Sequence, residues 1–549
     1  MKKKILSIIL VLSMILVLVV GCKAKDENSS VDIESKPQET IETDTTENTE
    51  ETKGEEISKS YGNDAKMSDF EMAKIEDVHR AMENPEGDIL LVDSRPQESY
   101  SGWALEGAKN GGHLKNAVLF SSRWLDCEYS AKAPREAYLE RAMADQGITK
   151  EKNIIVYDYS GNHAAHVAKY FKDLGISNVT VFSAKELIDA GKELESYKNH
   201  DRFLPTEIVK NISDIKTGKT TDMTPETKAV IGDNMDNVVL IDVGWGNAGG
   251  STYYSVGHVP GAVHINTDSY ERPRVYVPEK RSDYAKEWRL IPLEEFRDTL
   301  CPQYGITKDS IVILTGTGTS PQGRLGFMLR SLGVKVYAMS GALTAWKYNG
   351  YELDTAPDTL VVPTAVENFG DDTISNPDEI LWMDTIKSIL AGTTPGQVAD
   401  NRGKDEWDGQ YSGYDYHDLA GRIEGSIWCP QGDEKEGQYF DNVDNTPRTK
   451  KELIGHMEKY GLDTTNTVAF FCGDSWGAAH ISYFCQANDI ETIKQWGEGW
   501  IPWSNLGNEF IDHNGVKVHY DKYKDTLLDA NDKDVRDDIN ILGDKSNEE

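Results

Sequence analysis

The stretch Val468-Ala-Phe-Phe-Cys-Gly-Asp-Ser-Trp-Gly-Ala-Ala-His480 decides the fold of this chain. Its apolar residues 468–471 predict a buried strand, residues 472–477 a short loop, and the residues after them a helix. A cysteine between a strand and a helix N-terminus lies beside backbone N–H groups that stabilise an anion. We therefore expect Cys472 to have a lowered pKa or to hold a negatively charged adduct. The alternative is a buried structural thiol.

The same pattern of helix, apolar strand, polar loop and helix occurs three times in the chain. The strands follow Gly147-Ile-Thr-Lys150, Gly305-Ile-Thr-Lys308 and Gly461-Leu-Asp-Thr464, and they lead to the equally spaced loop positions Asp158, Thr315 and Cys472. A repeat of this length indicates a duplicated domain, and the chain is too long for a single core.

Two further landmarks recur upstream of each loop. The first is a short strand ending in Asp: Ile89-Leu-Leu-Val-Asp-Ser-Arg95, Val238-Val-Leu-Ile-Asp-Val-Gly244 and Gln397-Val-Ala-Asp-Asn-Arg402. The second is Gly112-His-Leu-Lys-Asn-Ala117, Gly257-His-Val-Pro-Gly-Ala262 and Gly421-Arg-Ile-Glu-Gly-Ser426. Continuous apolar strands that alternate with helices predict parallel sheets covered on both faces. A ligand site is then expected at the carboxyl ends of the strands.

The order of strand-Asp-x-Arg, Gly-His-x-Pro-Gly-Ala and strand-Cys-loop-helix resembles the rhodanese (sulfurtransferase) domain. The resemblance covers roughly residues 66–510 as three tandem copies. It implies an α/β protein of three rhodanese-like domains, each a mainly parallel sheet with helices on both faces. We place them at residues 66–205, 206–360 and 361–535, of which the third has the cysteine.

The resemblance also implies a sulfurtransferase that needs no cofactor. Sulfane sulfur from thiosulfate or 3-mercaptopyruvate would form a persulfide on Cys472 and pass to a thiol or cyanide acceptor by a ping-pong mechanism. Asp158 and Thr315 cannot form a persulfide, so the first two copies are expected to be non-catalytic scaffold. The loop residues expected to direct N–H groups at the sulfur are Gly473, Asp474, Ser475, Trp476 and Gly477.

Two arginines are candidates for contacting an anionic donor. Glu406 lies near the place where two-domain sulfurtransferases have a donor-binding arginine, and Arg402 or Arg422 would compensate for it. The alternative for Arg402 is structural pairing. Cys429 is a candidate for a disulfide with Cys472, with an ordinary buried thiol as the alternative.

Other chemistries fit the sequence less well. No arginine closes the loop after Cys472, which argues against a phosphatase, and no His/Cys cluster indicates a metal site. Gly473-Asp-Ser-Trp-Gly477 matches the G-x-S-x-G of serine hydrolases, with Asp512 and His513 or His519 downstream. Too little chain follows Ser475 for the later strands of that fold.

The two ends of the chain are expected to lie outside the three folded domains. Residues 1–22 resemble a bacterial lipoprotein signal in which Cys22 is lipidated, and the alternative is a transmembrane anchor. Residues 23–65 predict a disordered acidic linker, and residues 536–549 an acidic tail. The net charge of −34 argues against nucleic-acid binding. We therefore expect an extracytoplasmic protein that a lipid anchors to the membrane.

A second hypothesis remains open from the sequence. The departures of the loops from the family pattern and the acidic composition also suit a non-catalytic, surface-anchored binding protein. Replacing Cys472 by serine separates the two hypotheses, because only the enzyme depends on that thiol.

Overall fold

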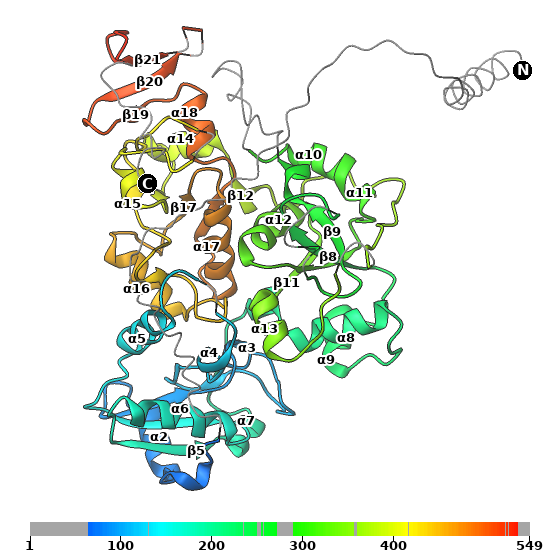
Figure 1. Cartoon of the computed structure of the whole chain (residues 1–549), viewed down its shortest axis with the longest axis vertical. Helices are drawn as coiled ribbons and strands as arrows, with labels where there is room; N and C mark the ends of the chain where they lie inside the picture. The colour runs from blue at the N-terminus through cyan, green and yellow to red at the C-terminus, as the bar shows by residue number, and fades with distance from the viewer. Residues whose placement is uncertain are drawn as a thin grey trace, which may run out of the picture. The chain divides into compact units, whose positions relative to one another are not determined.

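Three sheets of parallel strands form the framework of the protein (Figure 1). The computed structural model describes residues 64–535, apart from 130, 234, 250–253, 256, 272–288, 356–358, 415–416, 522 and 525. The signal segment 1–22, nearly all of the linker 23–65 and the tail 536–549 lie outside the described residues. None of the helices within the described part has the length and apolar character to span a membrane.

The strands of the three sheets occur in one common order. The first sheet has the order β3-β1-β4-β5, the second β7-β11-β10-β8-β9 and the third β12-β18-β17-β13-β14. The strands are β1 (Ile89–Asp93), β3 (Val118–Leu119), β4 (Asn153–Asp158), β5 (Val179–Ser183), β7 (Phe203–Leu204), β8 (Val238–Gly244), β9 (Val263–Asn266), β10 (Ile311–Thr315), β11 (Lys335–Met339), β12 (Ile380–Leu381), β13 (Gln397–Asp400), β14 (Ile427–Trp428), β17 (Val468–Phe471) and β18 (Ile493–Trp496). An isolated parallel bridge from Met72 to Val181 completes the same order in the first sheet.

Helices flank each of these sheets. Those of the first repeat are α2 (Ile75–Glu83), α3 (Gln97–Ser101), α4 (Arg123–Asp126), α5 (Arg135–Gln146), α6 (Asn162–Asp173) and α7 (Lys185–Ala190). Those of the second are α8 (Thr206–Lys216), α9 (Pro225–Ile231), α10 (Leu293–Glu295), α11 (Cys301–Gln303), α12 (Thr319–Ser331) and α13 (Ala342–Tyr348). Those of the third are α14 (Met383–Leu390), α15 (Lys404–Trp407), α16 (Lys450–Lys459), α17 (Trp476–Ala487) and α18 (Trp500–Asn505). The predicted α/β class, with mainly parallel sheets flanked by helices, is confirmed.

Two strand placements refine the expected organisation. Strand β7 pairs with β11 of the second sheet, although the expected boundary at 205/206 assigns it to the first domain. A three-stranded antiparallel sheet follows the third repeat, made of β19 (Phe510–Ile511), β20 (Lys517–Asp521) and β21 (Thr526–Asp529). It joins the third repeat through a backbone bridge between Arg422 and Ile511. The sequence motifs did not predict this antiparallel sheet.

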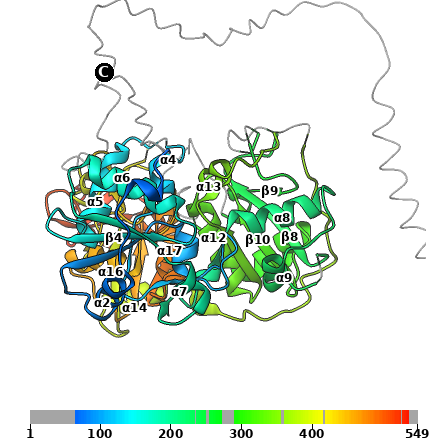
Figure 2. The same cartoon turned by 90° about the horizontal axis from the view of Figure 1, so that it is seen from below.

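The second and third repeats share a hydrophobic core. One cluster of buried side chains continues from Phe203 in the second repeat to Ile493 in the third. Helices α12 and α17 lie side by side within it (Figures 1 and 2). Gly323 and Gly326 allow this close approach, since a Cβ on Gly323 would lie 2.9 Å from the carbonyl oxygen of Ala479. The two repeats therefore pack as one body rather than as separate domains.

A buried ion pair joins the first repeat to the third. Arg123 of α4 donates from Nε to Asp444 Oδ2 at 2.6 Å, and Trp124 donates to the other oxygen of the same carboxylate at 3.1 Å. Glu98 accepts two further hydrogen bonds from Arg123. Because these charged groups are buried and mutually satisfied, the contact fixes the position of the first repeat against the third.

The helix contact predicts opposite effects of the same substitution at two glycines. Gly323→Ala should destabilise the protein by about 1–3 kcal/mol, because the new methyl group meets backbone that cannot move aside cheaply. Gly455→Ala in α16 is the matched control, since a Cβ there meets no atom within 4 Å. It should stabilise the protein by about 0.5–1 kcal/mol through helix propensity. Urea unfolding measures both; a Gly323→Ala variant as stable as wild type would contradict the close contact.

Candidate functional site

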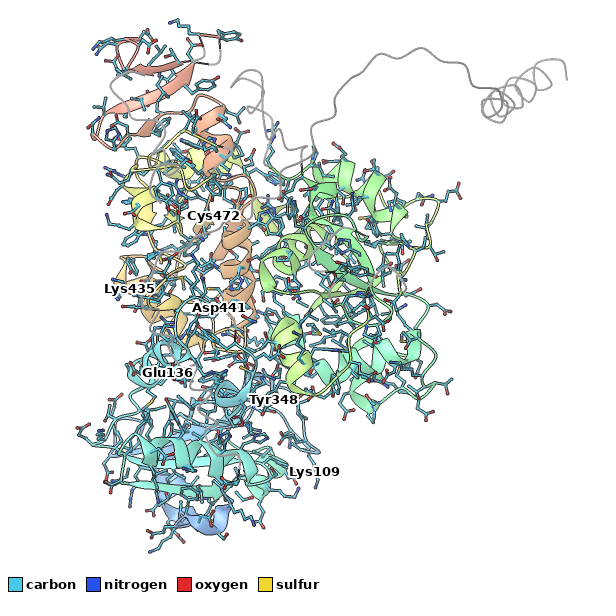
Figure 3. The ribbon with its side chains drawn as sticks, viewed as in Figure 1. Lys109, Glu136, Tyr348, Lys435, Asp441 and Cys472 are labelled. Carbon is cyan, nitrogen blue, oxygen red and sulfur yellow. The ribbon has the colours of Figure 1, made fainter. Side chains whose placement is uncertain are left out.

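Cys472 lies where β17 ends, and the loop after it leads directly into α17 (Figure 3). The backbone of this loop is fixed against α18. The N–H group of Trp500 donates to the carbonyl of Cys472 at 2.9 Å, and that of Ile501 to the carbonyl of Gly473 at 2.8 Å. The predicted strand, loop and helix are therefore present, and the side chain of Cys472 is half-buried at the carboxyl edge of the third sheet.

Two backbone N–H groups face the sulfur of Cys472. The donors are Gly477 and Ala478, which lie in the first turn of α17. The sequence placed the donors within residues 473–477. Gly477 belongs to that set, and Ala478 lies one residue beyond it. N–H groups in the first turn of a helix lack intrahelical partners and stabilise a negative atom. The arrangement suits a thiolate or an anionic sulfur adduct.

The pKa of the free thiol nevertheless moves in the direction opposite to our expectation. The pKa of Cys472 is raised to about 11, first by burial and then by the carboxylate of Asp474. Sγ lies 3.9 Å from Asp474 Oδ1, to which the thiol donates. The N–H groups of Gly477 and Ala478 and the charge of Arg324 lower the pKa, but by less. The expected lowering was wrong because the sequence could not weigh burial against the donors.

Ser475 occupies the strained position of the loop. Its φ of 69° lies in the left-handed region, which favours glycine over residues with a side chain. The side chain is fully buried, and its Oγ has no hydrogen-bond partner among the described residues. Asp512, the acid of the alternative hydrolase triad, instead accepts from the N–H groups of Asn514 and Val516 in its own turn. The G-x-S-x-G motif therefore does not assemble a serine hydrolase site.

Trp476 connects the loop of residues 472–477, here called the active loop, to the second repeat. Its Nε1 donates to Glu271 Oε1 at 2.8 Å, and Arg324 of α12 donates from Nε to the same oxygen at 2.7 Å. Sequence reasoning missed Glu271 and Arg324, because neither lies in a recognised motif of the third repeat. The second repeat thus contributes residues to the surroundings of the loop, beyond the scaffold role expected for it.

The two candidate donor-binding arginines have other contacts. Arg402 is fully buried and donates to both carboxylate oxygens of Asp400 and to the carbonyl of Gly421. Its guanidinium also lies 4.6 Å from the ring of Trp500. Arg402 therefore has the structural role named above as the alternative. Arg422 lies over the ring of Trp407 at 5.8 Å, beside the bridge to β19.

Burial changes the pKa of two further groups that the sequence analysis considered, the carboxylate of Glu406 and the thiol of Cys429. Burial raises the pKa of Glu406, which accepts a hydrogen bond from the N–H group of Gly403 at 2.9 Å. Cys429 is a free, fully buried thiol whose pKa is raised by burial, which matches the alternative rather than a disulfide with Cys472.

The equivalent loops of the other repeats hold different groups. In the first repeat the carboxylate of Asp158 occupies the place of the sulfur and accepts hydrogen bonds from the N–H groups of Gly161 and Ala164, the latter at 3.0 Å. In the second repeat the hydroxyl of Thr315 donates to the carbonyl of Ile241 at 3.1 Å. Neither side chain can carry a sulfur atom, so Cys472 is the sulfur-binding candidate among the three positions.

Replacing Asp474 tests the cause of the raised pKa. Asp474→Asn removes a negative charge beside the thiol, so the pKa of Cys472 should fall and its thiolate should form at lower pH. Alkylation of Cys472 by iodoacetamide at pH 8 should then be about 3-fold to 10-fold faster. Asp384→Asn, at an exposed position of α14, is the control and should leave the rate unchanged. A slower or unchanged rate in Asp474→Asn would refute this role of the carboxylate.

Comparisons with known proteins agree with the repeat structure. Residues 74–184 and 227–349 match the model of the Rhodanese-like domain family. The third repeat, with Cys472, lies outside these matched residues. The chain is 24% identical over 418 residues to the thiosulfate sulfurtransferase YnjE of Escherichia coli (strain K12), covering 75% of this chain and 86% of that protein. It is 22% identical over 268 residues to thiosulfate/3-mercaptopyruvate sulfurtransferase 1, mitochondrial, of Arabidopsis thaliana, covering 46% of this chain and 66% of that protein.

Solved structures share the fold over most of the chain. Wild-type EanB superposes with a TM-score of 0.67 at 23% identity, covering 81% of this chain and 98% of EanB. The anaerobic ergothioneine biosynthesis enzyme from Chlorobium limicola, in complex with trimethyl histidine, gives a TM-score of 0.66 at 23% identity, with coverage of 79% and 97%. At this identity the likeness establishes the fold of the chain alone.

Proposed function

We propose that this chain, whose residues 74–184 and 227–349 match the Rhodanese-like domain family, transfers sulfane sulfur from thiosulfate or 3-mercaptopyruvate to a thiophilic acceptor through a persulfide on Cys472. The observation that carries the proposal is the position of Cys472 at the strand end, with the N–H groups of Gly477 and Ala478 directed at its sulfur. The relatives named for thiosulfate and 3-mercaptopyruvate support the choice of donors.

The reaction divides into two displacements at sulfur. With thiosulfate, the thiolate of Cys472 attacks the outer sulfur, the S–S bond of the donor breaks, and sulfite leaves with the bonding electron pair. The persulfide now carries the negative charge on its terminal sulfur, which the N–H groups at the start of α17 stabilise. Cyanide or a thiolate then attacks that terminal sulfur, and the Cys472 thiolate is released for another cycle.

The raised pKa sets the pH dependence of the first step. Because the pKa of Cys472 is about 11, only a small fraction of the thiol is ionised near neutral pH. The rate of sulfur loading should therefore increase with pH throughout the neutral and mildly alkaline range. The alternative, a non-catalytic surface-anchored binding protein, is favoured by the same raised pKa, and the thiol-dependence of the activity distinguishes the two.

Formation of thiocyanate measures the proposed activity directly. The full chain, incubated with cyanide and either thiosulfate or 3-mercaptopyruvate, should release thiocyanate, faster with its preferred donor. Cys472→Ser should reduce the rate to that of the uncatalysed mixture, because serine cannot form a persulfide. Cys429→Ala, which removes a buried thiol with no assigned role, should retain the activity. A Cys472→Ser variant as active as wild type would refute the proposal.

We further propose that the protein is exported and tethered to the outer face of the cell membrane by a lipid on Cys22. The support is the sequence of residues 1–22, with a basic start, an apolar stretch and a small residue before the cysteine. The acidic linker after it would hold the three repeats away from the membrane surface.

A further inference from the structure

We propose that Arg324, which belongs to the second repeat, supplies the positive charge that stabilises the anionic sulfur on Cys472, so that the second and third repeats build the sulfur site together. The inference deepens the proposed function and rests on it only for the identity of the anion, a thiolate or a persulfide. It gives the second repeat, whose own loop has Thr315, a defined role in the chemistry.

Hydrogen bonds connect Arg324 to both segments that flank Cys472. On one side, Glu271 Oε1 accepts from Arg324 Nε at 2.7 Å and from Trp476 of the active loop at 2.8 Å. On the other side, Arg324 Nη2 donates to the carbonyl of Gly497 at 3.4 Å. The segment after Gly497 continues to Trp500, whose N–H group donates to the carbonyl of Cys472 at 2.9 Å. The guanidinium is therefore linked to the loop after Cys472 through Glu271 and to the segment that ends at Trp500 through Gly497.

The buried guanidinium of Arg324 has one hydrogen-bond donor that no described residue accepts from. The side chain is fully buried, and Nη1 has no hydrogen-bond partner among the described residues. A buried cationic group with an unused donor is costly unless an anion lies nearby. Glu271 balances one unit of charge, and a sulfur anion on Cys472 would make use of the remaining donor. The charge of Arg324 already acts on Cys472, where it lowers the pKa of the thiol.

The other charged groups around the loop do not replace Arg324. Asp474 and Glu271 are negative, and Glu498, which accepts from the N–H group of Met383, adds a third carboxylate on the segment after β18. Arg402 is positive and its Nη1 also has no partner among the described residues, but its guanidinium is bonded to both oxygens of Asp400. Of the two arginines, Arg324 is the one whose charge lowers the pKa of Cys472. Glu498 is itself paired with Arg289 at 3.8 Å, so those two charges offset each other. An anion on Cys472 therefore depends on the positive charge that α12 brings from the second repeat.

The alkylation rate of Cys472 as a function of pH tests this inference. The full chain reacts with iodoacetamide, and mass spectrometry follows the peptide that contains Cys472. Arg324→Met should shift the profile to higher pH and slow alkylation at pH 8 by about tenfold, which corresponds to about one pKa unit. Glu271→Gln should shift the profile the other way, because it removes a negative charge and retains an acceptor for Trp476. Arg324→Lys keeps the charge and should stay close to wild type.

A control separates the charge from the packing of the two repeats. Ser320 also lies on α12 and contacts the third repeat, where its Oγ is 3.4 Å from His480 Nδ1. Ser320→Ala loses that contact without changing any charge, so its alkylation profile should match wild type. If Arg324 and Glu271 only maintained the packing, their replacement would shift the profile in the same direction or leave it unchanged. Either result would overturn the inference.

A second pair of variants tests the inference if Arg324→Met does not fold. That variant leaves the carboxylate of Glu271 buried without its cation, which is strongly destabilising. Arg324→Met combined with Glu271→Gln avoids this, and its reference is the single variant Glu271→Gln. In that background the loss of Arg324 should again slow alkylation about tenfold, and an equal rate would overturn the inference.

The outcome is independent of sulfur transfer itself, since alkylation needs no sulfur donor. If Cys472 accepts no sulfur from any donor but Arg324→Met slows its alkylation, the proposed function fails and the role of Arg324 stands. If Cys472 accepts sulfur but the profile is the same in all variants, the function stands and the role of Arg324 fails.

Discussion

The close approach of helices α12 and α17 is the contact on which the candidate site depends. Gly323 removes the side chain that would separate the two helices, and Gly326 does the same one turn later, opposite Tyr483. This approach fuses the cores of the second and third repeats, and it brings Arg324 of one repeat within hydrogen-bond reach of the backbone that positions Cys472 in the other. The second repeat, whose own loop has Thr315, therefore contributes Arg324 to the surroundings of Cys472 in its neighbour.

The loop between strand and helix is an anion site in two of the repeats. In the first repeat a carboxylate, Asp158, already satisfies the N–H groups, so no ligand is required. In the third repeat the same groups face Cys472, and the charge must come from the thiolate or from sulfur bound to it. Burial and Asp474 disfavour this charge in the resting thiol. The proposed chemistry therefore takes the site from a neutral resting thiol to an anionic persulfide.

The sequence predicted the fold well because its landmarks repeat in a fixed order. Strands β1 and β13 end at Asp93 and Asp400, where the pattern placed them, and Cys472 follows the end of β17. Strand β8 instead continues two residues past Asp242 to Gly244. The direction of the Cys472 pKa shift was not predictable, since burial depends on what packs over the loop. Arg324 was not predictable either, because its contact with the third repeat joins positions far apart in the chain. For Arg402 the sequence left donor binding and structural pairing open, and the structure shows that it pairs with Asp400.

Mass spectrometry of the full chain after exposure to thiosulfate or 3-mercaptopyruvate tests the central claim, that Cys472 carries the sulfur, most directly. The account predicts a gain of one sulfur atom, about 32 Da, on the peptide that contains Cys472, and its loss when cyanide or a thiol is added. A Cys472 peptide that stays unmodified with every donor, while its thiol is free and reduced, would contradict the account.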